Sequence, residues 1–273
     1  MSAITPERRR SAEGRAREHQ RSTAALADAA GERSRAGPRH GPGLRASVAA
    51  LLRKELLVEL RTLESVPGMC LFAVSTFVVF HFALNRANVE GDLAAGILFV
   101  TLLLASLLGI NRLFVADAEQ GGFEAFLLAP VDSSAVLIAK VIALFTYLVA
   151  LEVVAVAAFA LLLLGPPIGG ALAGVVIVLL LADVGIAVIG TLVAALVVRS
   201  RARDLLGPLL ALPLLIPVVI GAASALAPLL AAHAPGFTSW ITGSAARWLA
   251  TLALYDLLFG LLAYAVFDFL LED

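Results

Sequence analysis

The stretch that decides the fold is IGGALAGVVIVLLLADVGIAVIGTLVAALVV, residues 168–198, in which Asp183 is the only charged residue. A helix needs about 20 mostly apolar residues to cross a bilayer. Five further stretches meet this requirement: 66–84, 93–110, 141–164, 205–232 and 248–267. None of them alternates apolar and polar residues over segments of about 10, as a transmembrane β-barrel does. The sequence therefore predicts an all-α integral membrane protein with six transmembrane helices.

The overall composition excludes a water-soluble globule and a disordered chain. Hydrophobic residues make up 60% of the 273 residues and charged residues 15%, whereas soluble domains are about 45–50% apolar and about 25% charged. A single cysteine, Cys70, lies within the first apolar stretch. No disulfide framework and no cysteine metal cluster is therefore expected within this chain.

The distribution of basic residues predicts the orientation. With six spans both termini lie on one side of the membrane, and 18 of the 20 Lys and Arg residues fall on that side. They are the thirteen up to Arg61, then Arg112, Lys140, Arg199, Arg201 and Arg203; only Arg86 and Arg247 fall on the other side. Because cytoplasmic loops carry the excess of Lys and Arg, both termini are predicted to be cytoplasmic.

Two segments precede the first span. Residues 1–45 hold ten Arg against five acids and no sustained apolar face, which predicts a disordered basic cytoplasmic tail able to touch anionic lipid head groups. Residues 46–64 place apolar residues at helical spacing, which predicts an amphipathic elbow helix in the cytoplasmic interface. Glu59 falls within its apolar arc. We expect either a basic partner for Glu59 or a helix that faces protein there; a simple cytoplasmic cap is the alternative.

Residues 116–134 are predicted to form a cytoplasmic coupling loop. This segment holds four acids and no Lys or Arg. Gly121 and Gly122 break the chain before a short helix over 123–128, which Pro130 ends. Apolar side chains on a short acidic loop suit a groove in a partner protein better than water, although a re-entrant or interfacial turn is the alternative. The candidate coupling residues are Asp117, Glu119, Gly121, Gly122, Glu124, Phe126, Leu127, Leu128 and Pro130.

Three acids lie within the predicted spans: Glu152, Asp183 and Asp256. Intramembrane carboxyl groups are costly and are functional candidates by default. They suggest a proton or cation path, hydrogen bonds between helices, or ion pairs with Arg112 or Lys140, and we favour structural pairing. The four His do not cluster, and His81 and His233 near the outer side are weak candidates for haem ligation.

Signatures of catalysis are absent from the sequence. It has no G-x-x-x-x-G-K-[ST] phosphate loop, no H-E-x-x-H pair of zinc ligands and no G-x-S-x-G nucleophile turn. We therefore predict no catalytic residue, no bound metal and no bound cofactor. Pro208, Pro213 and Pro217 recur through the fifth span, which predicts a bent helix.

Three blocks of sequence resemble a known family. They are LRKELLVELRTLES at 52–65, the segment 117–140 with its GGFE, LLAP and AK elements, and GTLVAAL at 190–196 followed by LPLLIP at 212–217. Together they resemble the haem exporter protein B family, CcmB, over roughly residues 46–270. The resemblance implies the ABC-2-like permease subunit of the cytochrome c maturation complex, in the bacterial inner membrane.

The resemblance also implies partners. A separate CcmA-like subunit would bind and hydrolyse ATP, a CcmC-like protein would handle haem, and a small CcmD-like protein and a CcmE-like haem chaperone would complete the assembly. The family implies two copies of the permease, contact with membrane lipid and no nucleic acid. By carry-over, Gly121, Gly122, Glu124, Leu127, Leu128 and Pro130 would couple to the ATPase. This sequence has only Trp240 and Trp248 and no tryptophan-rich motif, which fits haem being held by a partner.

Other functions remain open from the sequence. The chain also fits an ABC-2-type permease that exports a lipid, polysaccharide or drug. A proton-coupled secondary transporter would use Glu152, Asp183 and Asp256, but such proteins are built from inverted repeats and no clear repeat is visible. A passive membrane scaffold would tolerate substitution throughout the predicted coupling loop.

Overall fold

The computed structural model describes residues 43–84, 88–113, 133–164, 168–198, 200, 202–243 and 245–272. Regular secondary structure in this part of the chain is helical, apart from an isolated bridge between Val89 and Leu164. The helices belong to one unit, Leu44–Asp273. The predicted tail lies almost wholly outside the described residues.

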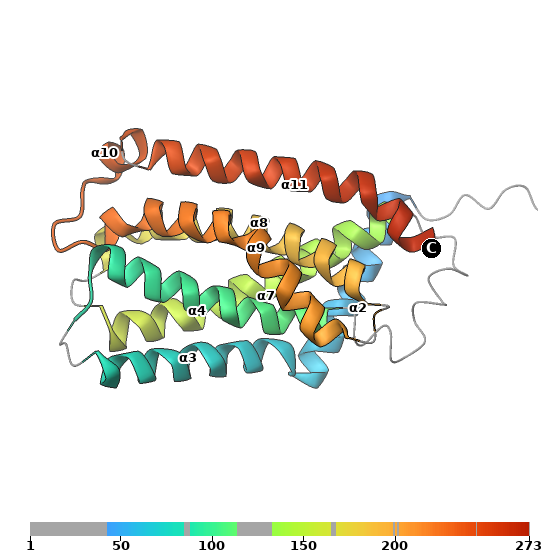
Figure 1. The fold of residues 1–273 in the computed structure, drawn as a ribbon, viewed down its shortest axis with the longest axis horizontal. Helices are drawn as coiled ribbons and strands as arrows, with labels where there is room; N and C mark the ends of the chain where they lie inside the picture. The colour runs from blue at the N-terminus through green and yellow to red at the C-terminus, as the bar shows by residue number, and fades with distance from the viewer. Residues whose placement is uncertain are drawn as a thin grey trace, which may run out of the picture. The chain divides into compact units, whose positions relative to one another are not determined.

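Six of the helices are long and apolar enough to cross a membrane, which confirms the predicted all-α membrane fold. They are α3 (Ser65–Ala83), α4 (Gly91–Arg112), α7 (Ser133–Leu162), α8 (Leu172–Val197), α9 (Arg203–Leu226) and α11 (Ala246–Glu272). The shorter elements are η1 (Ile168–Gly170), η2 (Ala227–Leu230) and α10 (Phe237–Thr242). Figure 1 shows the six long helices side by side, with α2 (Leu44–Thr62) at the same end as the C-terminus of α11.

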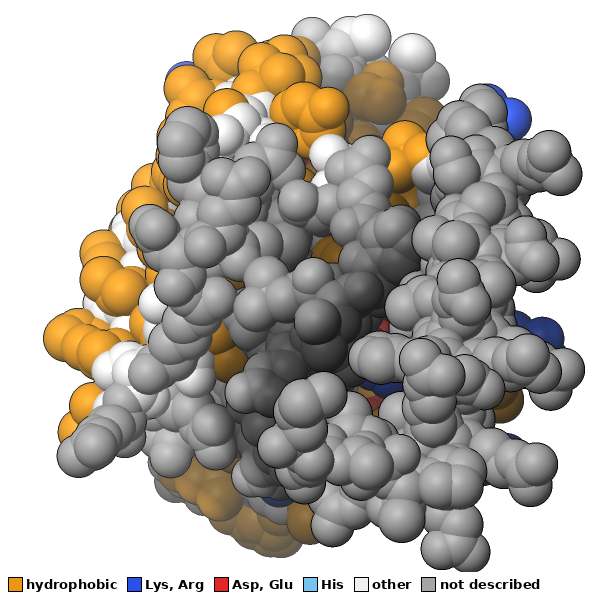
Figure 2. Space-filling view, turned by 90° about the vertical axis from the view of Figure 1, so that its right-hand side faces the viewer, with side chains coloured by type: hydrophobic (Ala, Val, Ile, Leu, Met, Phe, Trp, Pro, Cys, Tyr) orange, Lys and Arg blue, Asp and Glu red, His pale blue; other side chains and the backbone are white. Residues whose placement is uncertain are grey.

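The inside of the bundle is formed mainly by α4 and α8. Of the apolar windows of these helices, 72% and 61% are buried, against 17% for α3 and 22% for α11. The outer helices instead expose large apolar side chains, among them Leu71, Phe82 and Leu257. Figure 2, which looks at the end of the bundle that carries α2, shows such hydrophobic side chains along the visible flank. This distribution suits a protein surrounded by hydrocarbon rather than water.

Close contact between α4 and α8 depends on a glycine. A Cβ atom at Gly190 would lie 2.7 Å from Ile110 Cγ1 and 3.1 Å from Leu144 Cδ2. Small residues let membrane helices approach closely and gain packing contacts. Gly190 therefore sets the spacing of α4, α7 and α8 in the core.

Two helices differ from simple straight spans. The third apolar stretch covers 141–164, and α7 begins before it at Ser133, at the end of the predicted coupling loop 116–134. Lys140, which lies between these two points, is buried inside the bundle. Helix α9 contains Pro208, Pro213 and Pro217, and Figure 1 shows it changing direction along its length. Each proline removes a backbone hydrogen bond and clashes with the preceding turn, which bends a helix.

Candidate functional site

The predicted coupling residues lie outside the part of the chain that the structure describes. These are Asp117, Glu119, Gly121, Gly122, Glu124, Phe126, Leu127, Leu128 and Pro130, all within 114–132. The structure does describe both borders of this segment. Leu113 follows the end of α4, and α7 begins at Ser133. The described part of the candidate site therefore consists of these two borders.

A buried lysine links three helices at the borders of this segment. Lys140 of α7 is 2% exposed, and its Nζ lies 3.0 Å from Glu55 Oε1 of α2. The same Nζ donates a 2.8 Å hydrogen bond to the carbonyl oxygen of Leu113. Tyr147 of α7 donates from its hydroxyl to the Glu55 carbonyl oxygen at 3.3 Å. We call Glu55, Lys140, Tyr147 and the Leu113 carbonyl the elbow brace.

The elbow brace fixes the elbow helix to both borders of 114–132. An ion pair that is buried and also hydrogen-bonded to backbone holds its geometry, because removing either partner leaves an unpaired polar group in an apolar setting. The Arg112–Glu64 pair lies nearby at 2.9 Å, but its side chains are 53% and 65% exposed. Exposed pairs of this kind contribute about 0–1 kcal/mol, so the buried link dominates.

Glu59 of α2 caps the first span. Its Oε1 accepts hydrogen bonds from the backbone N–H groups of Ser65 at 2.9 Å and Val66 at 2.8 Å. A carboxylate at a helix N-terminus satisfies unpaired N–H groups and complements the helix dipole. The chain turns between the two helices at Leu63, where φ is 50°. Glu59 is 9% exposed, so this part of α2 faces protein, which was one of the two expectations for it.

Two of the intramembrane acids come together. Glu152 of α7 and Asp183 of α8 lie close to each other between the two helices, and the two residues are 8% and 3% exposed. Asp183 Oδ2 has no hydrogen-bond partner among the described residues. Arg112 pairs with Glu64 and Lys140 pairs with Glu55, so both bases contact acids of the elbow segment 46–64.

Asp256 of α11 stands apart from that pair. A Cβ atom at Gly185 of α8 would lie 2.5 Å from Asp256 Oδ1, so the carboxyl group packs directly against the α8 backbone. Neither carboxyl oxygen has a hydrogen-bond partner among the described residues. The described part of the chain contains no group of three His, Cys, Asp or Glu side chains able to hold a metal ion.

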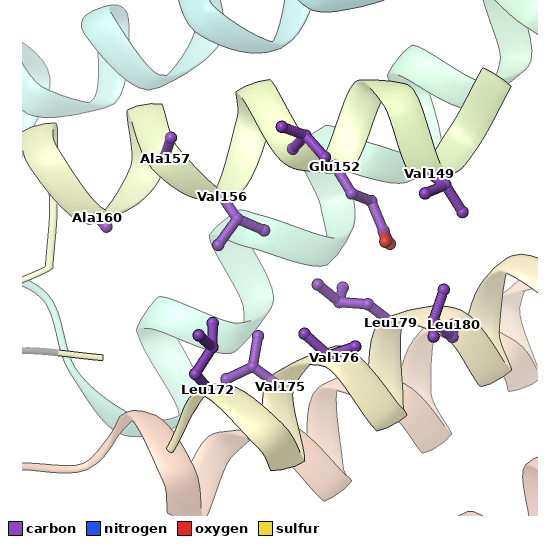
Figure 3. Close-up of a pocket in the computed structure, with 11 residues that line it drawn as sticks. Val149, Glu152, Val156, Ala157, Ala160, Leu172, Val175, Val176, Leu179 and Leu180 are labelled. Atoms are coloured by element: carbon purple, nitrogen blue, oxygen red, sulfur yellow. The ribbon is translucent and has the colours of Figure 1, made fainter. Parts of the chain in front are cut away.

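A groove between α7 and α8 contains Glu152 close to one of its ends. It has a volume of about 470 Å³, and every other residue that lines it is apolar. Figure 3 shows the Glu152 side chain reaching from α7 towards α8, with Leu179 and Leu180 opposite it and Ala157 and Ala160 farther along α7. We call this space the α7–α8 groove. Its chemistry suits an apolar ligand that donates one hydrogen bond or carries one positive charge.

The two outer histidines have different settings. The Nδ1 atom of His81, near the end of α3, lies 2.5 Å from the carbonyl oxygen of Leu162 at the end of α7. His233 is exposed in the connection between η2 and α10. Trp240 is fully buried and donates from Nε1 to the Ala225 carbonyl oxygen at 2.9 Å, which fastens α10 to α9. The hydrogen bonds of His81 and Trp240 each give the residue a structural role.

Sequence reasoning missed the elbow brace. Glu55 lies in a run of alternating charges and leucines, RKELLVEL at 53–60, where nothing distinguishes it from its neighbours. The signal lay in Lys140, a lone cation near the start of an apolar stretch. A buried lysine requires an acidic partner, but the sequence does not show which acid supplies it.

Known proteins resemble this chain over most of the helical unit Leu44–Asp273. The model of the CcmB protein family matches residues 46–264. The chain is 33% identical over 172 residues to Heme exporter protein B of Rhodobacter capsulatus, covering 63% of this chain and 78% of that protein. It is 32% identical over 177 residues to Heme exporter protein B of Pseudomonas aeruginosa, covering 64% of this chain and 78% of that protein.

Proposed function

The chain belongs to the CcmB protein family, and on this premise we propose that it is the membrane permease subunit of an ABC transporter complex for cytochrome c maturation. The subunit takes part in haem export or in ATP-driven release of a haem-loaded chaperone. The similarity to two proteins named Heme exporter protein B supports this proposal. Six apolar helices provide the multi-pass membrane domain that a permease needs.

In this proposal ATP is hydrolysed by a separate CcmA-like subunit. The acidic loop 116–134 receives the movement of that ATPase, and Glu124, Phe126 and Pro130 belong to its contact. The elbow brace supports this assignment. Lys140 of α7 donates a 2.8 Å hydrogen bond to the Leu113 carbonyl oxygen at the border of the loop, and its Nζ lies 3.0 Å from Glu55 Oε1 of α2. A rigid link at this place transmits a displacement of the loop to α2, α4 and α7 together.

Haem is handled by partner subunits in this proposal, and this chain binds no cofactor. Haem needs an axial ligand for its iron and partners for its propionates. The α7–α8 groove instead presents a carboxyl group and apolar side chains. Trp240 is fully buried, and Trp248 lies beneath the Arg247 guanidinium at 5.0 Å, so neither forms an open platform for haem. CcmC-like, CcmD-like and CcmE-like proteins are the proposed partners.

The complex is placed in the bacterial inner membrane, with two copies of this chain and both of its termini in the cytoplasm. The excess of basic residues on the side of the termini supports this orientation, and the positions of α2 and the C-terminal end of α11 at one end of the bundle agree with an even number of spans.

Affinity purification of the full chain from native membranes in mild detergent tests the proposal. We expect mass spectrometry to identify a P-loop ATPase and a haem-handling membrane protein. Recovery of an ATPase alone would favour a generic exporter, and recovery of neither would contradict the proposal. In the same assay Phe126→Asp and Glu124→Lys are expected to lower ATPase recruitment and cytochrome c yield without loss of membrane-inserted chain. Normal recruitment and yield in both variants would overturn the assignment of the loop.

A further inference from the structure

We propose that the exposed side of α2 is a binding site for an anionic phospholipid of the leaflet at this end of the bundle. Leucines of this side contact the acyl chains, and arginines bind the phosphate of the head group. The inference goes beyond the proposed function and does not depend on it.

The exposed side of α2 combines basic residues with leucines. It consists of Arg53, Lys54, Leu57, Leu60 and Arg61, all of which are exposed, and we call these five residues the outer face of α2. Leu57 lies at its centre, because each of the other four precedes or follows it by three or four residues, and such positions are neighbours on a helix surface. Leu57 is 41% exposed and Leu60 is 69% exposed.

The acids of α2 lie on the opposite side of the helix. Glu55 pairs with α7 in the elbow brace, and buried Glu59 accepts hydrogen bonds from the start of α3. They are the two acids of α2, so the outer face itself contains no carboxylate. The helix is thereby held through its acids, and its bases are left on the surface.

Two arginines of the outer face carry the proposal. Lys54 contacts Glu55 at 3.7 Å, so its charge is partly offset. Arg53 and Arg61 form no ion pair with another described residue. They lie four residues from Leu57 on either side. An anion that sits over Leu57 is therefore within reach of both guanidinium groups.

Helix α2 lies at the level of the membrane boundary. It ends at Thr62, and the first span, α3, begins three residues later at Ser65. On its inner side α2 contacts Lys140 and Tyr147 of α7, which flank the start of the apolar stretch 141–164. An amphipathic helix at this level places its exposed apolar side chains at the boundary between head groups and acyl chains.

An anionic phospholipid supplies both chemistries that the outer face requires. Each Lys or Arg near an anionic membrane surface strengthens binding about fivefold, whereas the cation of a zwitterionic head group offsets its phosphate. The apolar part of the surface also continues towards the first span, because Leu63 at the turn into α3 is 60% exposed. This continuity favours lipid over a soluble acidic protein as the occupant.

Fluorescence quenching in lipid nanodiscs tests the inference on the full-length chain. The single cysteine is removed with Cys70→Ala, and bimane is attached through Ala50→Cys, three residues before Arg53 and on the exposed side. The control position is Leu161→Cys, which is 86% exposed at the other end of α7. Phosphatidylcholine discs receive increasing fractions of phosphatidylglycerol or phosphatidylcholine that carries a nitroxide quencher on the acyl chain next to the head group.

We expect half-maximal quenching at position 50 with about a threefold or lower fraction of phosphatidylglycerol than of phosphatidylcholine. The preference should fall to near one in Arg53→Gln, Arg61→Gln and in about 1 M salt, where the screening length is about 3 Å. Leu57→Ser, Leu60→Ser should weaken quenching by both lipids. The matched control Arg112→Gln, which removes a base that pairs with Glu64, should keep the preference, and position 161 should show none.

Three outcomes would overturn the inference. Equal quenching of position 50 by both lipids would mean that the face touches lipid without selecting charge. Absence of quenching by either lipid would mean that the face lies in water or is covered by protein. An unchanged preference in Arg53→Gln, Arg61→Gln would assign the selectivity to other bases, such as the ten Arg of residues 1–45. Gel filtration of each variant verifies that the exposed substitutions leave the chain folded.

Discussion

Lys140 is the single charge on which the packing of the elbow helix depends most. Its Nζ serves both Glu55 Oε1 and the Leu113 carbonyl oxygen while the side chain is 3% exposed. Lys140→Met keeps the length of the side chain and removes both contacts. We expect it to lower the free energy of unfolding by about 2–4 kcal/mol, slightly below the range for a fully buried pair because Glu55 retains 14% exposure. Reversible unfolding in mixed detergent measures the change.

The matched control for Lys140→Met is Arg112→Met, which breaks the exposed pair with Glu64. We expect this change to cost about 1 kcal/mol or less. The double variant Lys140→Met, Glu55→Gln should be more stable than the sum of its single effects implies, by about 1–3 kcal/mol, because each single variant strands the other partner. Additive effects would show that Lys140 and Glu55 do not depend on each other.

Individual residues show which features of the structure can be predicted from the sequence. The six apolar stretches follow directly from composition, and Glu59 was recognised as misplaced on a lipid-facing surface. Its true partners, the N–H groups of Ser65 and Val66, could not be foreseen, because they depend on the turn at Leu63. The pairing of Lys140 with Glu55 was missed for the same reason: the two lie far apart in sequence, and only the docking of α2 against α7 brings them together.

At the scale of elements, the corner between α2 and α3 depends on Glu59. Glu59→Ala removes the acceptor for two backbone N–H groups at the start of α3. Loss of a helix cap typically costs about 0.5–2 kcal/mol, and we expect a destabilisation of about 1–2 kcal/mol here because the site is buried. The same unfolding assay measures it. Glu59→Gln retains one carbonyl acceptor and should lose less; equal losses in both variants would mean that the charge, not the hydrogen bond, matters.

The packing of α4 on α8 depends on the space at Gly190. Gly190→Ala places a Cβ atom 2.7 Å from Ile110 Cγ1, so the Ile110 side chain or one of the helices must shift. Overpacking of this kind typically costs about 1–3 kcal/mol. Gly96→Ala in α4 is the control, since a Cβ there meets nothing within 4 Å, and it should be neutral or stabilising by up to about 1 kcal/mol. A neutral Gly190→Ala, measured by the unfolding midpoint, would contradict the close approach.

The lengths of the helices show what periodicity alone cannot supply. The first span was predicted within one residue of α3, because a turn and charged residues flank it. Helix α7 begins eight residues before the apolar stretch 141–164, and a buried ion pair lets Lys140 lie within the helix. Charge therefore marks the end of a span only where water, rather than another helix, solvates it.

At the scale of the whole molecule, the intramembrane acids divide the bundle into two settings. Glu152 and Asp183 face each other between α7 and α8 beside an open groove, whereas Asp256 packs against α8 from α11. Sequence reasoning found all three acids and favoured structural pairing, which stays a prediction. It had no means of separating the pair from Asp256, because that separation is set by which faces of α8 meet α7 and α11.

The fold allows two orientations of the bundle in the membrane, with both termini either in the cytoplasm or on the opposite side. Six spans place α2 and the C-terminal end of α11 at one end of the bundle, and the excess of Lys and Arg predicts that this end is cytoplasmic. Green fluorescent protein fused after Asp273 is expected to fluoresce, and alkaline phosphatase at the same site to be inactive. Alkaline phosphatase inserted next to His233, in the connection before α10, is the control and should be active. Phosphatase activity from the fusion after Asp273 would mean an inverted bundle or an odd number of spans. In that case the elbow brace and segment 114–132 would face away from any cytoplasmic ATPase, and the coupling role proposed for them would fall with the orientation.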